Sequence, residues 1–284
     1  MVNFKSRSNS FPTQSHSAVE SLEAQLCRLK SSEAASTSAS YVCAKLDGLR
    51  VLHEAIKGKI PMSSIQQELS RKQGQELINE LLEGSLRLVD HCQLSRDIVQ
   101  LTKESVQDLE SSIRRNKGEA ACGVDFSSYA TSRNMIKKMI NKCVKNLRSF
   151  NKNSTEVTGS DCDLNAIGTL LKEAEVQAFS ALNSVFILLS GEKERSNQRS
   201  WSFLSKLTKI NNVHSKVEQE NNFEELYSLD FPKSQRGMDS IALQNVSKQL
   251  RASEMIIQEL EEGLEAFFRS LVKTRVSLLN ILSY

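Results

Sequence analysis

The sequence from Leu243 to Leu282 reads LQNVSKQLRASEMIIQELEEGLEAFFRSLVKTRVSLLNIL and contains no proline. A large aliphatic residue recurs at every seventh position, and the position three residues further on is mostly apolar as well. Such a repeat keeps one side of a helix facing its neighbours over many turns. The stretch therefore predicts one long helix, beginning near Asp239, that packs lengthwise against other helices. The two series are Leu243, Leu250, Ile257, Leu264, Leu271 and Leu278, and Val246, Ser253, Leu260, Phe267, Thr274 and Ile281.

The composition favours helices along the whole chain of 284 residues. It has three prolines and none between residues 62 and 231, which leaves room for long uninterrupted helices. Aromatic residues make up 6%, and no stretch sustains the alternation of a strand. We therefore predict an all-α fold, an elongated helical bundle with long coiled-coil-like helices.

Apolar periodicity also places the other elements. Further helices are expected near residues 19–29, 38–57, 77–113, 125–150 and 163–190, with short ones after Ser63 or Ser64 and around Trp201. The helix at 77–113 is long enough to be the main partner of the repeat. From Leu264 onward the apolar side is wider than a two-stranded seam needs, which favours the centre of a monomeric bundle over a dimer zipper. The domain plan is a disordered serine-rich tail at 1–15 and one helical domain at 16–284, with a long connection at 191–236.

The cysteines and the absence of a hydrophobic signal sequence favour a reducing compartment. Six cysteines lie far apart and form no Cys-x-x-Cys pair. The longest uncharged stretch, Val176 to Ser190, is too short to span a bilayer. We expect a cytoplasmic protein. The alternatives are an organelle, because the N-terminus is rich in serine and poor in acid, or the periphery of a membrane.

None of the common catalytic or phosphate-binding motifs occurs in the chain. His91 and Cys92 are adjacent, but neighbours on a helix point in different directions and no second pair completes a metal site. A net charge of +3 does not by itself indicate a nucleic-acid partner. We therefore predict a non-enzymatic protein with no cofactor, no metal and no nucleic acid partner.

The segment from 126 to 155 is strongly basic and contains no acidic residue. Such an amphipathic helix could contact an anionic membrane surface or enter a calmodulin-like groove. It could equally be a bundle helix whose apolar side is core and whose charges are in water. The candidate contact residues are Arg133, Lys137, Lys138, Lys142, Lys145 and Arg148.

The tail carries the sequence Arg7-Ser8-Asn9-Ser10-Phe11-Pro12. Arg7 lies three residues before Ser10 and Pro12 two residues after it, as in the Arg-Ser-x-phosphoSer-x-Pro ligand of 14-3-3 proteins. A phosphate on Ser10 would offer a doubly charged group to an arginine cluster. The chain is therefore a candidate 14-3-3 client. The alternatives are an organelle transit segment and a plain disordered end.

Several blocks together resemble the plant BYPASS-like proteins. They are RSNSFPTQSHSAVESLEAQLCRLKSSE at 7–33, ELLEGSLRLVDHC and the sequence that follows it at 80–119, YATSRNMIKKMINKCVKNLRS at 129–149, RSWSFLSKL at 199–207 and LEEGLEAFFRSLVKTRVSLLNILS at 260–283. The most specific parts are Gly84–Cys92 and Arg269–Ser283. The resemblance implies a helical regulatory protein involved in root and shoot development, and it supplies no catalytic residues.

Overall fold

The computed structural model describes residues 14–31, 38–60, 72–115, 124, 126–150, 163–190 and 240–282. This part of the chain forms six α-helices and no strand, so the all-α prediction is confirmed. The long connection and the two short helices expected outside the main bundle fall beyond the described residues. The helices are α1 (Gln14–Ser31), α2 (Ala39–Lys57), α4 (Lys72–Arg115), α5 (Phe126–Phe150), α6 (Asp163–Ser190) and α8 (Ser240–Leu282).

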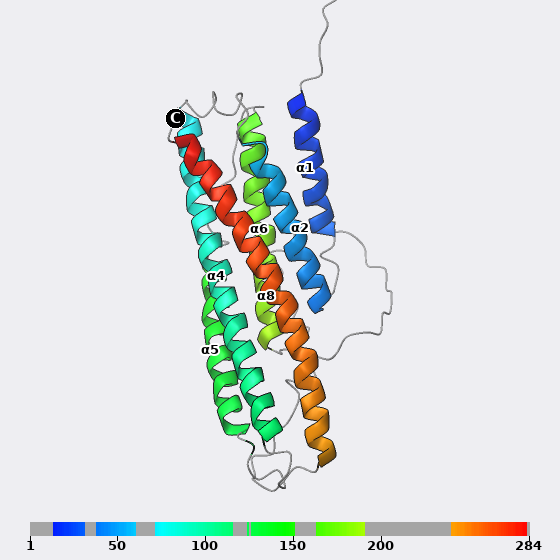
Figure 1. Cartoon of the computed structure of the whole chain (residues 1–284). Coiled ribbons are helices and arrows are strands. Elements are labelled where there is room, and N and C mark those ends of the chain that lie inside the picture. The colour runs from blue at the N-terminus through cyan, green and yellow to red at the C-terminus, as the bar shows by residue number, and fades with distance from the viewer. Residues whose placement is uncertain are drawn as a thin grey trace, which may run out of the picture.

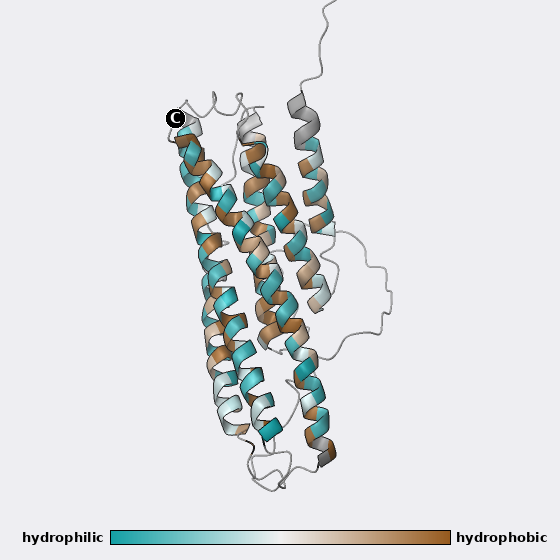
Figure 2. Ribbon diagram, in the orientation of Figure 1, coloured by the Kyte–Doolittle hydropathy of each residue, from teal (hydrophilic) through white to brown (hydrophobic). Residues whose placement is uncertain are grey.

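Four of these helices form the core of an elongated bundle (Figure 1). α8 packs against α4 and α2, and α6 packs against the same two helices, so the four close into a ring. α1 adds to the edge between α2 and α6, and α5 to the edge between α4 and α6. At a rise of 1.5 Å per residue, α4 is about 66 Å long, which sets the length of the bundle. Figure 2 shows hydrophilic and hydrophobic residues on different sides of the helices, as packing around a shared core requires.

The seven-residue repeat of α8 is the seam that faces this core. From Leu250 onward its first series is 0–3% exposed, and in the second series Val246, Leu260 and Phe267 are at most 1% exposed. Only the two ends of the repeat, Leu243 and Ile281, are half-buried. The predicted packing of the repeat against the 77–113 helix is confirmed, since α4 is one of its two principal neighbours. Helices of the same chain therefore cover the apolar seam of α8.

The corresponding seam of α4 is interrupted by small polar residues, yet it is buried just as deeply. Ser95 and Thr102 are 0% and 1% exposed. Their hydroxyls donate to the carbonyl oxygens of His91 and Ile98, four residues back, at 2.8 Å in both cases. Because the helix itself accepts these hydrogen bonds, the hydroxyls can lie in the core without an external partner.

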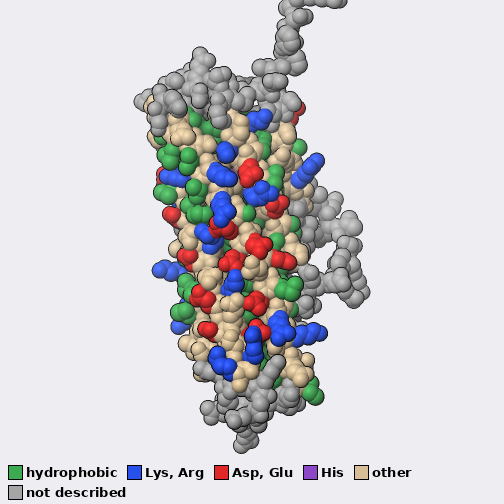
Figure 3. Space-filling view, in the orientation of Figure 1, with side chains coloured by type: hydrophobic (Ala, Val, Ile, Leu, Met, Phe, Trp, Pro, Cys, Tyr) green, Lys and Arg blue, Asp and Glu red, His purple; other side chains and the backbone are tan. Residues whose placement is uncertain are grey.

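Charged pairs cover the outer edge between α4 and α8, which run antiparallel. Lys103 Nζ lies 2.6 Å from Glu261 Oε2, and Arg251 Nε lies 3.1 Å from Glu110 Oε1. Arg96 pairs with Glu265 nearer the other end, and its guanidinium lies over the ring of Phe268. Figure 3 shows acidic and basic side chains interspersed over this face. Such surface pairs each contribute about 0–1 kcal/mol, so they add little to the stability of the bundle.

The uncharged stretch from Val176 to Ser190 lies within α6, and most of it is buried, although Val176 itself is 39% exposed. Ala174, Ala178 and Ala181 are fully buried, and these small residues let α6 lie close to its neighbours. Leu182, Val185 and Phe186 fill the core beside them. None of the helices that the structure describes is both long and apolar enough to cross a membrane.

Replacing Leu264 with Ala tests the importance of the α8 seam. Leu264 is fully buried, so its truncation leaves a cavity and should lower the free energy of unfolding by about 2–5 kcal/mol. Urea denaturation measures the change as a lower midpoint. The matched control is Met255→Ala on the outer side of the same helix, where the side chain is 69% exposed and the expected change is within about 0.5 kcal/mol. Equal effects of the two variants would contradict the assigned seam.

Candidate functional site

The basic helix predicted at 126–155 is present as α5 and lies along the edge of the bundle. Lys137, Lys138, Lys142 and Lys145 are all exposed, and we call these four residues the lysine face. Lys138, Lys142 and Lys145 follow one another at spacings of four and three, so they share one side of the helix. With no acidic residue anywhere in α5, the lysine face is a local concentration of positive charge.

Arg133 does not belong to this face, although the sequence suggested that it would. Its side chain is 6% exposed, and its Nη1 donates a hydrogen bond to the carbonyl oxygen of Leu189 at 3.1 Å. Leu189 is in the last turn of α6, where carbonyl groups lack helical partners and favour a cation. Arg133 therefore fastens α5 to the end of α6. Its spacing of three from Ile136 and seven from Ile140 is the sequence signal that places it on the apolar side.

The apolar side of α5 is buried in the bundle. Ile136, Ile140 and Cys143 are 0–3% exposed, and α5 packs on α4 and α6. Calmodulin-like grooves and membrane interfaces both take up the apolar side of a basic helix. In this fold the lysine face of α5 is exposed, whereas its apolar side is already buried against α4 and α6. The side chain of Arg148 lies outside the described residues.

The candidate phosphorylation motif at Arg7, Ser10 and Pro12 also lies outside the described residues. The predicted recognition by 14-3-3 proteins therefore stays a prediction from the sequence.

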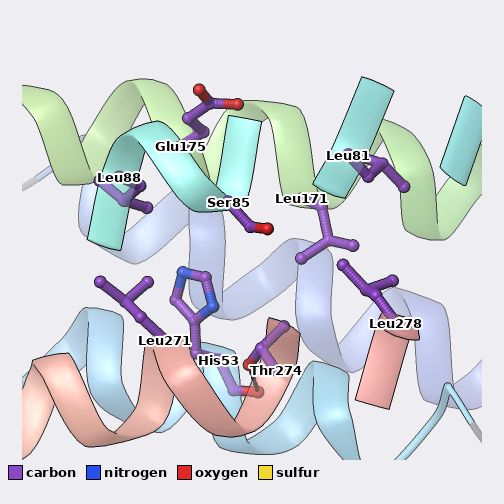
Figure 4. A pocket seen from close by; sticks show the side chains of 9 residues that line it. All are labelled: His53, Leu81, Ser85, Leu88, Leu171, Glu175, Leu271, Thr274 and Leu278. Carbon is purple, nitrogen blue, oxygen red and sulfur yellow. Dashed lines mark hydrogen bonds between the residues drawn. The ribbon is translucent and has the colours of Figure 1, made fainter. Parts of the chain in front are cut away.

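A second feature, which the sequence did not indicate as a site, is a small chamber on the axis of the four core helices (Figure 4). Its volume is about 20 Å³, and each of the four helices contributes to its wall. The lining residues are His53 from α2, Leu81, Ser85 and Leu88 from α4, Leu171 and Glu175 from α6, and Leu271, Thr274 and Leu278 from α8.

His53 dominates the chemistry of this chamber. Its side chain is 4% exposed, and neither ring nitrogen has a hydrogen-bond partner among the described residues. Its ring meets the ring of Phe267 edge to face, with 5.8 Å between the centroids. Burial lowers the pKa of His53 from 6.5 to about 4, so the imidazole is neutral near pH 7. His53 follows Leu49 by four residues and precedes Ile56 by three, which is the sequence signal for its inward position.

The hydroxyl groups near His53 come from Ser85 of α4 and Thr274 of α8. Ser85 Oγ donates to the carbonyl oxygen of Leu82 at 2.9 Å and accepts from Arg275 Nη1 at 2.9 Å. Thr274 Oγ1 lies 3.3 Å from the backbone oxygen of His53 and 3.0 Å from that of Ser270. These groups tie α8 to α4 and to α2 at the level of the chamber.

Glu175 lies at the edge of the chamber, and Figure 4 shows its carboxylate turned away from the ring of His53. Burial raises the pKa of Glu175, and the guanidinium of Arg87, whose Nη2 is 3.6 Å from Glu175 Oε1, opposes that shift. The carboxylate rests against Gly84, where an added Cβ would lie 2.5 Å from Glu175 Oε2. A glycine at position 84 therefore lets α6 bring this carboxylate close to α4.

The adjacent residues His91 and Cys92 lie in α4. Cys92 is fully buried, and His91 Nδ1 lies 2.7 Å from the carbonyl oxygen of Arg87 on its own helix. Within the described ranges, no three His, Cys, Asp or Glu side chains gather as metal ligands would. The four cysteines described, Cys27, Cys43, Cys92 and Cys143, are free thiols.

Comparison with known proteins identifies the family of this chain. A family model described as Protein BPS1 matches residues 45–281. The chain belongs to the BPS1 family. The resemblance to BYPASS-like proteins seen in the sequence is thereby confirmed. No curated protein and no solved structure matches the chain.

The two most specific blocks of the resemblance to BYPASS-like proteins meet at the chamber. Gly84–Cys92 supplies Ser85 and Leu88, and Arg269–Ser283 supplies Leu271, Thr274 and Leu278. Arg275 of the second block donates to Ser85 of the first. The lysine face lies on α5, in a different part of the bundle (Figure 1).

The buried side chain of His53 predicts a specific pH dependence of the free energy of unfolding. An unfolded chain binds a proton on His53 below about pH 6.5, whereas the folded chain does so only below about pH 4. Because the unfolded state binds more protons between these values, the free energy of unfolding falls as the pH drops through this window, by about 3 kcal/mol from His53. Urea denaturation at a series of pH values measures the fall.

His53→Leu should remove this contribution and flatten the pH profile between pH 6.5 and pH 4. His91→Leu is the matched control, because the ring of His91 is only half-buried and lies within hydrogen-bond distance of a backbone carbonyl oxygen. A profile that is equally steep for the wild type and His53→Leu would show that His53 is accessible to protons in the folded state.

Proposed function

We propose that this member of the BPS1 family is a non-enzymatic regulatory protein that acts by binding other macromolecules, in root and shoot development as the family resemblance implies. The observation that supports the proposal is the contrast between the two sides of α5. Its apolar side is buried, whereas its lysine face is exposed. A surface held in this way can recognise a partner without any change in the core. The filled seam of α8 supports the same view, because it leaves recognition to the outer faces of the bundle.

Proximity labelling in plant cells tests this proposal and gives the compartment and the partners together. A fusion of the full chain to a labelling enzyme should mark a recurrent set of proteins at one location, which we expect to be the cytoplasm. The labelling enzyme expressed alone is the control. Identical sets from the fusion and the control would contradict the proposal of a binding protein.

A second candidate function is a peripheral membrane- or calmodulin-binding module. The exposed lysine face supports the membrane version, because electrostatic docking needs only charges near an anionic surface. The buried apolar side of α5 opposes the calmodulin version, because that binding would require α5 to leave α4 and α6. The candidate is therefore a folded bundle that docks through its charges onto anionic lipid.

Replacing Lys137, Lys138, Lys142 and Lys145 with Glu tests the lysine face. Each lysine near an anionic surface contributes about 1 kcal/mol, so loss of four should weaken binding to vesicles containing phosphatidylserine roughly a thousandfold. Vesicle sedimentation at low and high salt measures the effect, and binding of the wild type should fall as salt rises. The fourfold Lys→Arg variant keeps the charge and should bind as the wild type does.

The wild type and the fourfold Glu variant also distinguish membrane binding from calmodulin binding. Binding of the wild type to calmodulin at the same strength as to the vesicles would favour release of α5 from the bundle. Binding that is unchanged by the fourfold Glu variant, on both vesicles and calmodulin, would exclude the lysine face as the contact.

A third candidate is a 14-3-3 client regulated through its N-terminus. A peptide of residues 4–15 phosphorylated on Ser10 should bind 14-3-3 protein, because the phosphate gains charge-assisted hydrogen bonds from arginines. Fluorescence polarisation measures the affinity. The unphosphorylated peptide is the control and should not bind. A phosphorylated peptide with no measurable affinity would end this candidate.

A further inference from the structure

The chamber on the bundle axis has the properties of a binding site for one small neutral molecule. His53 is almost completely buried and its ring projects into the chamber (Figure 4), yet neither ring nitrogen is satisfied by the described residues. A neutral imidazole carries one donor and one acceptor, and buried polar groups of this kind are nearly always hydrogen-bonded. Some partner for His53 is therefore required.

The chamber also limits the size and charge of that partner. A water molecule needs roughly 10–15 Å³ of such space, and the chamber offers about 20 Å³. No second water and no larger ligand would fit beside it. Five of the nine lining residues are leucines, which disfavours an ion because they cannot replace its hydration shell. The partner is thus neutral and about the size of a water molecule.

Ser85 and Thr274, which line the chamber with His53, keep free hydrogen-bonding capacity. Ser85 Oγ has two acceptor positions, and Arg275 Nη1 fills one of them. Thr274 Oγ1 contacts only carbonyl oxygens among the described residues, so its own acceptor positions remain for a donor. A buried water needs two to four polar partners, and His53, Ser85 and Thr274 together supply them.

We propose that this chamber binds a single ordered water molecule, which bridges His53 of α2 to Ser85 of α4 and Thr274 of α8. The water supplies a hydrogen-bond partner for one ring nitrogen of His53, which the described residues leave unsatisfied. It also extends the polar contacts made by Arg275 into a continuous network through the core. The network ties three helices together at one level of the bundle.

Magnetic relaxation dispersion of the water signal tests this site in the full chain, because it counts water molecules with long residence times. His53→Leu should lose one such water relative to the wild type, since leucine offers no hydrogen bond and has a similar volume. Ser95→Ala is the matched control, because its hydroxyl is equally buried on α4 but bonds the carbonyl oxygen of His91 outside the chamber. The control should keep the full number. Equal numbers in the wild type and His53→Leu would overturn the proposal.

A crystal structure of the wild type tests the proposed water site if His53→Leu does not fold. Density for a water molecule within hydrogen-bond distance of a His53 ring nitrogen and of Ser85 Oγ would support the site. A ring nitrogen bonded directly to another protein group, with no water density in the chamber, would overturn it.

Discussion

The packing of α8 against α2 and α4 is the contact on which the rest of the structure depends. α2 and α4 each touch both α6 and α8, so the core closes only when α8 occupies its side of the ring. The contact is built from fully buried aliphatic and aromatic residues such as Leu260, Leu264 and Phe267. Burial of this kind is the dominant favourable term in folding, whereas the ion pairs along the edges contribute little. The outer helices α1 and α5 then add to a core that α8 has completed.

The long helices place several polar residues in the core, and Ser95 and Thr102 differ from His53 in how they are accommodated. Ser95 and Thr102 donate hydrogen bonds to their own helix, which makes them acceptable anywhere along the seam. His53 does not do so, and neither of its ring nitrogens is bonded within the described part of the chain. The core opens beside it and offers Ser85 and Thr274 instead. A histidine at position 53 therefore needs polar partners in the core, whereas a leucine would not.

The sequence predicted the parts of the fold that follow from periodicity. The repeat from Leu243 to Leu278, its packing on the 77–113 helix, and the apolar burial of the Val176–Ser190 stretch all appear in the structure. Periodicity assigns a residue to a side of one helix, however, and does not say which other helices that side will meet. The chamber could not be predicted for this reason, since its lining residues come from four helices that are distant in the sequence. Arg133 was misplaced because its charge was given more weight than its spacing from Ile136 and Ile140.

The physical separation between the core and the lysine face bears on how such a protein could change partners. α5 contributes Ile136 and Ile140 to the core and is fastened to α6 through Arg133, so its orientation is fixed from the inside. Lys138, Lys142 and Lys145 are exposed and have no part in that attachment. Substitutions of exposed residues away from caps and networks usually change stability by less than about 0.5 kcal/mol. The charge pattern of α5 can therefore vary without loss of the fold, whereas a change at His53 or along the seam of α8 alters the core that holds α5 in place.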